Sequence, residues 1–376
     1  MYERIHQTLV KEFIQTFRDP KMMGIIFMMP IVQVLVFGYA VTTDVRNVKT
    51  AIHDLDNSVV SRELISRFEK SGYFDVVEYV PDDARATEMI DHDEVKAVLR
   101  INRGFGESLR AGLTSELQVI VDGTDSNTAG IVLDYSSKIS LRFSQQVLMT
   151  RFTRIRGMAQ KPGHVPLETR AWFNENLESR NFYVPGVIAI IVMLITLMLT
   201  SMAVVREKEI GTMEQIMVTP IRPFEFILGK TVPFALIGYV DVVLITVIGV
   251  FWFEVPIRGS LPLLFGATSL YLMTTLGVGL LISTVSSTQQ QAMMSTFFFY
   301  FPAVLLSGFM FPIGNMPTVI QWFTYLNPLR YFLVIIRGVF LKGVGLEILW
   351  PQMAALAIMG VATLWMASSR FQKTLA

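Results

Sequence analysis

Very few residues of this 376-residue chain have types and spacings that could do chemistry. Its four histidines are His6, His53, His92 and His164, and none lies in a long apolar run. No H-E-x-x-H or G-x-S-x-G pattern is present, so the parts of a zinc or serine hydrolase are missing. The chain has no cysteine, which excludes disulfides, thiolate catalysis and cysteine-ligated metals. We therefore predict no catalytic residues and no metal site.

One short pattern resembles part of a phosphate-binding loop. Gly229-Lys230-Thr231 matches the end of the G-x-x-x-x-G-K-[ST] motif, but the motif's first glycine would stand at position 224, which is Phe224. No strand precedes the pattern either. We interpret the match as chance and expect no cofactor on this chain.

Three polar residues, His53, Asp54 and Asp56, stand close together at the end of a segment expected to form a strand. Successive side chains of a strand point to opposite faces, so three such neighbours cannot all face one ion. Acidic side chains at a strand end more often cap nearby backbone groups or face water. We favour that role over a metal site.

Asp241 is the one ionisable residue deep within a predicted membrane span. A charged carboxylate at the bilayer centre costs about 2.5 kcal/mol or more, so such a residue marks a functional or paired site. A proton-driven carrier normally needs a relay of several such groups, and only one is recognisable. A structural hydrogen bond to a neighbouring helix is therefore favoured over proton transport.

An aromatic run at residues 297–301 contains Phe297, Phe298, Tyr300 and Phe301, and the neighbouring spans are rich in methionine. Such an adaptable apolar surface could line the path of a hydrophobic substrate. The same side chains could instead face lipid or pack between helices, and these two roles are slightly favoured.

Membrane-spanning helices must position these residues, because the composition does not suit a soluble protein. The chain is 52% hydrophobic and 17% charged, whereas soluble domains average about 25% charged residues. A bilayer crossing needs about 20 mostly apolar residues. Six stretches qualify, at residues 22–42, 182–205, 227–252, 261–283, 291–312 and 346–368. Residues 312–345 are apolar only in patches and are expected to form outer re-entrant helices.

The charged residues are segregated along the chain. Residues 43–180 contain 21 of the 31 acidic and 18 of the 32 basic residues. In the short loops, four basic residues lie on one side of the predicted spans, and ten lie on the other: Arg4, Lys11, Arg18, Lys21, Arg206, Lys208, Arg222, Lys230, Arg370 and Lys373. Because cytoplasmic loops carry the excess of Lys and Arg, both termini are expected in the cytoplasm.

Residues 43–181 are then expected to form one large extracytoplasmic domain, periplasmic in a bacterial inner-membrane protein. Strands are predicted at 48–54, 74–80, 95–101 and 117–122, with helices at 58–70, 82–92 and 103–112 between them. A long amphipathic helix is predicted from about 128 to 156, with Asp125 or Ser126 as its N-cap. The fold class is thus a polytopic helical membrane protein with an inserted α/β or α+β domain.

Two further segments, residues 1–21 and 206–220, are expected on the cytoplasmic side of the membrane. Residues 1–21 carry an apolar residue at every fourth position from Ile5 to Phe17, which predicts an amphipathic helix in the membrane interface. Residues 206–220 begin with charges and continue with apolar residues at helical spacing until Pro220. Such a helix could dock into a groove on a soluble partner or lie on lipid headgroups.

The second of these segments is specific enough to compare with a known family. Its sequence, Arg206-Glu-Lys-Glu-Ile-Gly-Thr-Met-Glu-Gln-Ile-Met-Val-Thr-Pro220, resembles the cytoplasmic signature of type-2 ABC exporter permeases. Stretches elsewhere agree in the right order: Lys11-Glu-Phe, Arg18-Asp-Pro, Asp122-Gly-Thr-Asp-Ser-Asn-Thr-Ala, Ser307-Gly-Phe-Met-Phe-Pro, Asn327-Pro-Leu-Arg-Tyr-Phe and Arg337-Gly-Val-Phe-Leu-Lys-Gly. The resemblance covers essentially the whole chain and is strongest to bacterial multidrug-type members.

The resemblance implies a division of labour. The chain would be the non-enzymatic membrane subunit, pairing with a second copy or a sister permease and docking a separate ATPase subunit. Residues 206–220 would be the coupling helix, with the ATPase contact made by Arg206, Glu207, Glu209, Gly211, Thr212 and Glu214. A hydrophobic or amphipathic substrate, drug-like or lipid-like, would leave the cytoplasm or inner leaflet. The outer domain could contact a periplasmic membrane-fusion adaptor.

Two other functions remain open. One is an ABC complex that transmits force to the cell envelope without transport, which sequence does not separate from export. The other is a sensor with an outer ligand-binding domain, which needs only two spans and a cytoplasmic output domain. The four further predicted spans and the short cytoplasmic segments disfavour the sensor.

Overall fold

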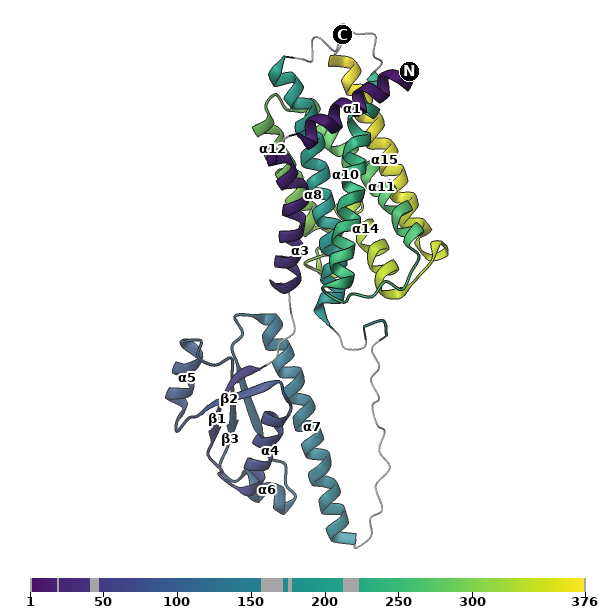
Figure 1. Ribbon diagram of the computed structural model, residues 1–376. Coiled ribbons are helices and arrows are strands. Elements are labelled where there is room, and N and C mark those ends of the chain that lie inside the picture. The colour runs from purple at the N-terminus through teal and green to yellow at the C-terminus, as the bar shows by residue number, and fades with distance from the viewer. Residues whose placement is uncertain are drawn as a thin grey trace. The chain divides into compact units, whose positions relative to one another are not determined.

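The computed structural model of the chain describes residues 2–18, 20–40, 47–156, 172–174, 178–211 and 223–374. The chain divides into two compact units, one formed by residues 1–42 together with 170–376 and the other by residues 43–169. The first unit is built of helices, and the second combines helices with a sheet (Figure 1). Each unit is described by itself below.

Four described helices of the first unit are long and apolar enough to cross a membrane. They lie within α8 (Ser179–Ile210), α10 (Pro223–Phe251), α11 (Leu261–Val285) and α15 (Leu346–Thr374). Helix α8 lies at the centre, because α10, α11 and three further helices described below, α3, α12 and α14, all pack against it. Its residues from Val184 to Ile195 are all buried, as a helix that is apolar on every side requires.

The first predicted span forms a helical run of about the expected length, whereas the fifth forms a shorter helix than expected. Residues 20–40 form a continuous helical run of α2 (Pro20–Met23), the π-helical η1 (Gly24–Met28) and α3 (Met29–Ala40). Helix α12 (Gln289–Leu305) has 17 residues and ends seven residues before the predicted boundary. Gly308 follows with a φ of +83°, a backbone conformation outside the helical region. The predicted boundary at residue 312 was therefore wrong.

The connection expected at 312–345 is helical but sharply bent. It contains η2 (Ile313–Asn315), α13 (Thr318–Thr324), α14 (Pro328–Arg337) and the π-helical η3 (Gly338–Lys342). The segments Thr318–Thr324 and Pro328–Lys342 meet at 78°, as in a broken span or a re-entrant loop. If this pair counts as one span, the described residues contain five candidate spans.

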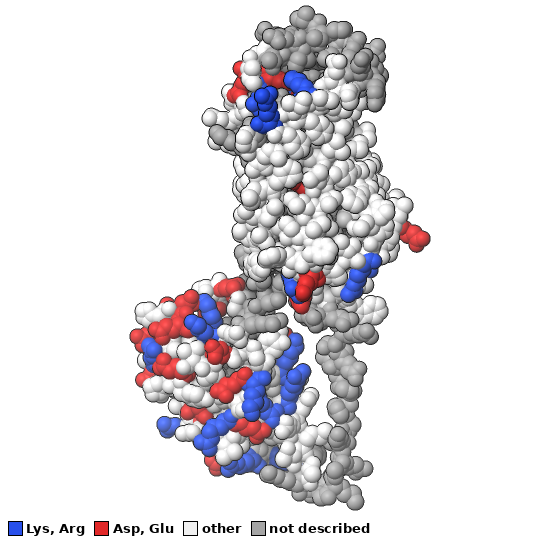
Figure 2. Space-filling view, viewed as in Figure 1, with Lys and Arg blue, Asp and Glu red and all other residues white. Residues whose placement is uncertain are grey.

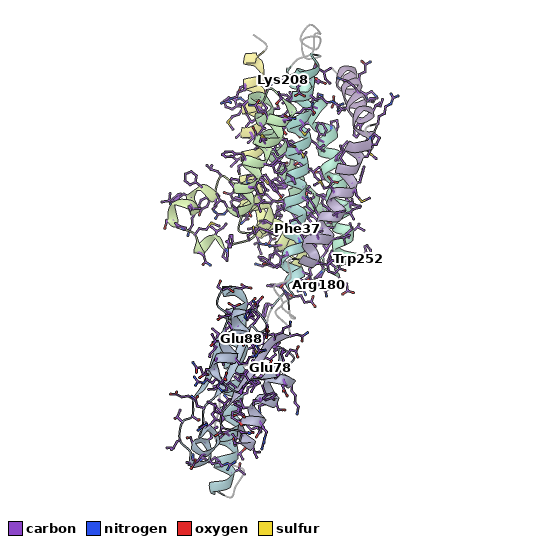
Figure 3. The ribbon with its side chains drawn as sticks, turned by 90° about the vertical axis from the view of Figure 1, so that its left-hand side faces the viewer. Phe37, Glu78, Glu88, Arg180, Lys208 and Trp252 are labelled. Carbon is purple, nitrogen blue, oxygen red and sulfur yellow. The ribbon has the colours of Figure 1, made fainter. Side chains whose placement is uncertain are left out.

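The helical unit has an apolar flank and charged ends. On the face seen in Figure 2, charged side chains are sparse over the middle of the long helices. Lys208 lies at one end of the unit, whereas Arg180 and Trp252 lie at the other (Figure 3). Small residues allow close helix contact inside the unit, because a Cβ on Gly277 of α11 would lie 2.3 Å from the Thr363 hydroxyl of α15.

The second unit contains a four-stranded sheet in the order β2-β1-β3-β4. The strands are β1 (Val48–Asp54), β2 (Phe74–Tyr79), β3 (Ala97–Ile101) and β4 (Leu117–Val121), close to the four predicted ones. Strand β1 pairs in parallel with β2 and β3, while β3 and β4 are antiparallel. The two central strands are mostly buried, which explains their Val-, Ile- and Ala-rich sequences.

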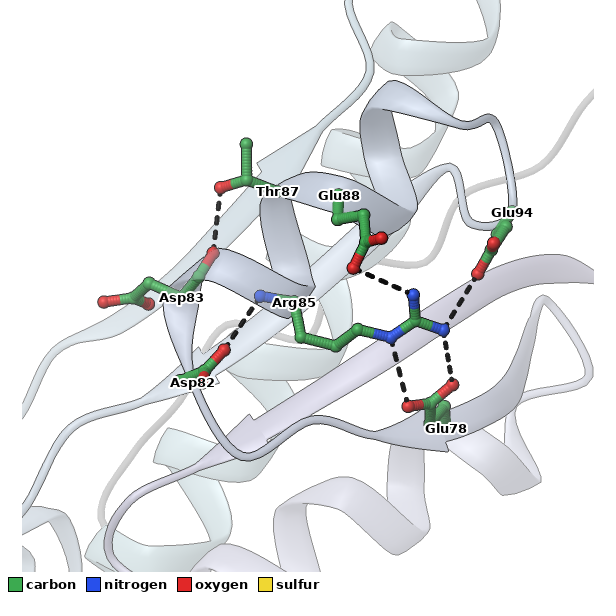
Figure 4. A network of polar contacts seen from close by, with 7 residues as sticks. All are labelled: Glu78, Asp82, Asp83, Arg85, Thr87, Glu88 and Glu94. Atoms are coloured by element: carbon green, nitrogen blue, oxygen red, sulfur yellow. Dashed lines mark hydrogen bonds and ion pairs between the residues drawn. The ribbon is translucent and has the colours of Figure 1, made fainter.

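Helices α4 (Val59–Lys70), α5 (Asp83–Asp91), α6 (Phe105–Ala111) and α7 (Ser126–Arg156) complete this unit. The backbone N–H of Thr128 donates to the carboxylate of Asp125, which confirms Asp125 as the cap of α7. One surface network holds α5 on the sheet: the guanidinium of Arg85 donates to Glu78, Glu88 and Glu94 (Figure 4).

Candidate coupling site at the end of helix α8

The predicted coupling helix does not begin at residue 206. Residues 206–210 are the last turn of α8, which ends at Gly211 with a φ of +79°. Only glycine adopts this left-handed conformation without strain, so Gly211 allows the chain to leave the helix here. Thr212, Glu214 and the rest of the predicted segment up to residue 220 lie outside the described residues.

Glu207 points into the protein rather than outward. Its Oε1 accepts hydrogen bonds from Lys230 Nζ of α10 at 2.7 Å and from Lys11 Nζ of α1 (Tyr2–Phe17) at 3.0 Å. Lys230 also donates to Glu12 Oε1 of α1 at 2.6 Å. The side chains of Glu12, Glu207 and Lys230 are 3–5% exposed. Its carboxylate is thus enclosed by α1 and α10, and its contact with a partner stays a prediction.

The next two residues bond to two further helices. Lys208 Nζ donates to the carbonyl oxygen of Ser283 at 2.8 Å, near the end of α11. A cation is favourable there because the last carbonyl groups of a helix carry partial negative charge. Glu209 accepts from the backbone N–H of Gln289 at 2.9 Å and from its side-chain amide, at the first residue of α12. The side chain of Arg206 is half-buried.

Three consecutive side chains thus hold α8 to four helices. Consecutive residues of an α-helix are about 100° apart around its axis, so they necessarily point in three directions. Glu207 contacts α1 and α10, Lys208 contacts α11, and Glu209 contacts α12. We name Lys11, Glu12, Glu207, Lys208, Glu209 and Lys230 the α8 clamp.

Asp241 of α10 is completely buried, and neither carboxylate oxygen has a hydrogen-bond partner among the described residues. The structural hydrogen bond expected for Asp241 is therefore wrong for this arrangement.

The aromatic residues of α12 differ in how exposed they are. Phe298 and Phe301 are 85% and 60% exposed, whereas Phe297 and Tyr300 are half-buried and their rings contact Phe301.

The three polar residues near the end of β1 have separate local partners. His53 bonds the carboxylate of Asp83 at 3.0 Å. Asp54 accepts from the Ser61 hydroxyl at 2.6 Å, and the carboxylate of Asp56 accepts the backbone N–H groups of Gly104 and Gly106 at 2.9 and 3.0 Å. Within the described ranges, no group of three His, Asp or Glu side chains could hold a metal ion.

Comparison with known proteins places these features in a family. Residues 20–368 match the family described as ABC-2 family transporter protein. The chain belongs to the ABC-2 transporter family. It is 33% identical to the "Probable multidrug ABC transporter permease YbhR" of Escherichia coli K12, with 99% of each chain covered. It is 32% identical to the "Probable multidrug ABC transporter permease YbhS" of the same strain, covering 98% of this chain and 97% of that one.

A third relative, the "Inner membrane transport permease YhhJ" of E. coli K12, is 30% identical over 86% of this chain and 85% of its own. The ABC-2 match includes residues of both units and every α8-clamp residue except Lys11 and Glu12. This ABC-2 protein is therefore a multi-pass transmembrane subunit of an ABC exporter, as the resemblance predicted.

Sequence reasoning missed two central residues of the α8 clamp, Glu12 and Lys230. Lys230 stands in the Gly229-Lys230-Thr231 pattern, and its side chain is enclosed by two carboxylates. A lysine near the start of an apolar helix and a glutamate within an amphipathic one were the available signals. Lys230 and Glu12 are 218 residues apart in the chain, and Lys230 and Glu207 are 23 residues apart. Neither pairing can therefore be read from local spacing.

Proposed function

We propose that this ABC-2 permease is driven by a separate ATPase subunit that docks on residues 212–220, directly after the α8 clamp. The observation that carries the proposal is the set of bonds from Glu207, Lys208 and Glu209 to four different helices. Movement of the docked segment would pull on the last turn of α8 and be shared among α1, α10, α11 and α12. ATP and Mg²⁺ belong to the partner, and this chain contributes no catalytic group.

The proposed topology has six crossings with both termini in the cytoplasm. Residues 20–40 form a continuous helical run, and 21 residues at about 1.5 Å each are about 31 Å long, enough to cross the hydrocarbon core. Lys11, Lys208 and Lys230 belong to one cluster at one end of the helical unit, which supports a cytoplasmic location for that end. Residues 43–181 then lie outside, and 312–345 form an outer re-entrant connection.

We further propose that two permeases pair around a path for hydrophobic or amphipathic molecules, drug-like or lipid-like. The relatives named as multidrug permeases support this substrate class. The exposed rings of Phe298 and Phe301 support an apolar surface that faces lipid, the second permease or the substrate. A periplasmic adaptor is the proposed partner of the outer unit.

Charge reversal after the α8 clamp tests the docking segment. Glu214 is a sharper position than Glu209, because Glu209 already bonds to Gln289. Glu214→Lys should lower the amount of ATPase subunit that co-purifies by about tenfold or more, since a like-charge contact costs affinity. Glu347→Lys, an exposed change in the first turn of α15, is the matched control. If equal amounts of the ATPase subunit co-purify with the parent protein, Glu214→Lys and Glu347→Lys, residues 212–220 are excluded as the docking site.

The orientation can be tested with single cysteines, because the natural chain has none. Glu116→Cys lies on an exposed residue of the second unit, and Lys373→Cys lies near the end of α15. A membrane-impermeant maleimide should label the first in spheroplasts and the second only after lysis. The opposite labelling pattern would reverse the proposed topology.

A further inference from the structure

The unit of residues 43–169 contains a cavity of about 650 Å³ beside α7. Helix α7 runs alongside α4 and the sheet, as Figure 1 shows. One wall is apolar and comes from α4, α6, β4 and α7: Leu64, Phe105, Leu117, Val119, Phe143 and Val147. Ligand pockets usually measure about 300–1,000 Å³ and are lined mostly by apolar side chains, so the size and wall suit a small molecule.

A row of hydroxyl groups on α7 also lines the cavity. Ser136, Ser140 and Ser144 follow at four-residue spacing, which places them on one helix face. The hydroxyls of Ser140 and Ser144 donate to carbonyl oxygens one turn earlier at 2.8 and 2.9 Å, so their own oxygens remain able to accept. Ser136 is 2% exposed, and its hydroxyl has no partner among the described residues. These three serines are the polar residues of this helix face, and Arg151 follows them on the same helix.

Arg151 stands at the far end of the same helix face. Its Nη2 donates to the carbonyl oxygen of Ala111 at 3.2 Å. A Cβ at residue 112 would lie 1.2 Å from Arg151 Nη1, so Gly112, with a φ of +81°, is what allows this approach. No ion pair of Arg151 with a described carboxylate is present, and none of the described residues lining the cavity is acidic. The cavity therefore has an apolar body and a cationic end.

We propose that this cavity binds an elongated amphipathic acid, an acyl chain that ends in a carboxylate. The chain would lie along the wall from Leu64 to Val147, and the carboxylate would accept hydrogen bonds from Arg151. Ser136 and Arg151 are 15 residues apart, which is about 22 Å along an α-helix. An extended chain fits this length better than a compact molecule does. The described residues that line the cavity all belong to the unit of residues 43–169, and the proposal does not depend on how the permease is driven.

Photolabelling of the full-length protein in neutral lipid nanodiscs tests the proposal. The probes are dodecanoic acid and dodecanol, each carrying a diazirine at the chain end, and the labelled peptides are identified by mass spectrometry. The acid should label peptides from residues 105–119 and 133–148, and unlabelled dodecanoate should compete. Arg151→Gln should weaken this labelling by about tenfold, the usual effect of losing a charged hydrogen bond.

Arg142→Gln is the matched control, because Arg142 is exposed on α7 and does not line the cavity. Ser140→Trp, which fills the cavity, should abolish labelling of the second unit while the far-ultraviolet circular dichroism stays unchanged. If Ser140→Trp alters the fold, the comparison of Arg151→Gln with Arg142→Gln decides alone. Equal labelling by acid and alcohol, equal loss in the two arginine variants, or labelling confined to the membrane helices would each overturn the proposal.

Discussion

The α8 clamp makes a strong prediction about Lys230. Lys230→Met keeps the length and apolar stem of the side chain but removes the cation that lies 2.6 Å from Glu12 and 2.7 Å from Glu207. All three side chains are at most 5% exposed, so water cannot replace the lost contacts. Removing one partner of a buried ion pair costs about 3–5 kcal/mol, because the remaining charge stays buried without compensation. Glu207 keeps its contact with Lys11, so we expect the lower end of that range.

Lys11→Met is the control with which the stability loss of Lys230→Met is compared. Lys11 also bonds to Glu207, at 3.0 Å, but its side chain is 54% exposed. Exposed ion pairs contribute about 0–1 kcal/mol, so this variant should be nearly as stable as the parent protein. The assay is unfolding in mixed micelles followed by tryptophan fluorescence. It reports on the helical unit, because all five tryptophans lie at or beyond residue 172.

A triple variant, Lys230→Met with Glu12→Gln and Glu207→Gln, separates lost charge from lost packing. It removes the negative charge of the two buried carboxylates that lose Lys230 in Lys230→Met, so it should recover a large part of the lost free energy of unfolding. The reasoning is refuted if Lys230→Met is no less stable than Lys11→Met. It is equally refuted if the triple variant is as unstable as the single one.

Three further predictions concern other parts of the chain. Asp241→Leu should raise the free energy of unfolding by about 1–3 kcal/mol in the same assay, because it removes a buried group without partners. Gly277→Ala should lower it by about 1–3 kcal/mol, because the new Cβ would overlap Thr363. Hydrogen bonds from Thr124, followed by Lys96, lower the pKa of Asp122 to about 2. The depressed pKa stabilises the folded state above the ordinary value near 4 and loses this effect as the pH falls toward 2. The melting difference between the parent and Asp122→Asn, followed by circular dichroism, should therefore shrink over that range.

Sequence patterns predicted the elements that depend on local composition. The long apolar runs became α8, α10, α11 and α15, and the segments rich in Val and Ile became the four strands of one sheet. Local composition is informative here because a helix in lipid and a central strand are both apolar over their whole length. The cap of α7 at Asp125 was also predictable, since the capping bond joins residues three apart.

Helix ends were predicted less well. The predicted span ends at residue 205, whereas the helix continues to Ile210. Charged residues do not end a helix when neighbouring helices supply partners, as α1, α10, α11 and α12 do here. Similarly, the cavity beside α7 depends on how α6 and β4 pack against that helix. The spacing of its three serines alone does not reveal it.

The nature of the α8 clamp also bears on how force could pass through it. Apolar contacts between helices are non-directional, so two helices held only by them can slide or rotate with little change in contact energy. The bonds of Lys230 are directional and short, and any rotation of α8 that moves Glu207 by a few ångströms would break one and leave a charge buried. The α8 clamp thus raises the free energy of intermediate orientations of α1, α8 and α10. Two discrete arrangements are then favoured over a continuum, and a permease that alternates between inward and outward access needs that property.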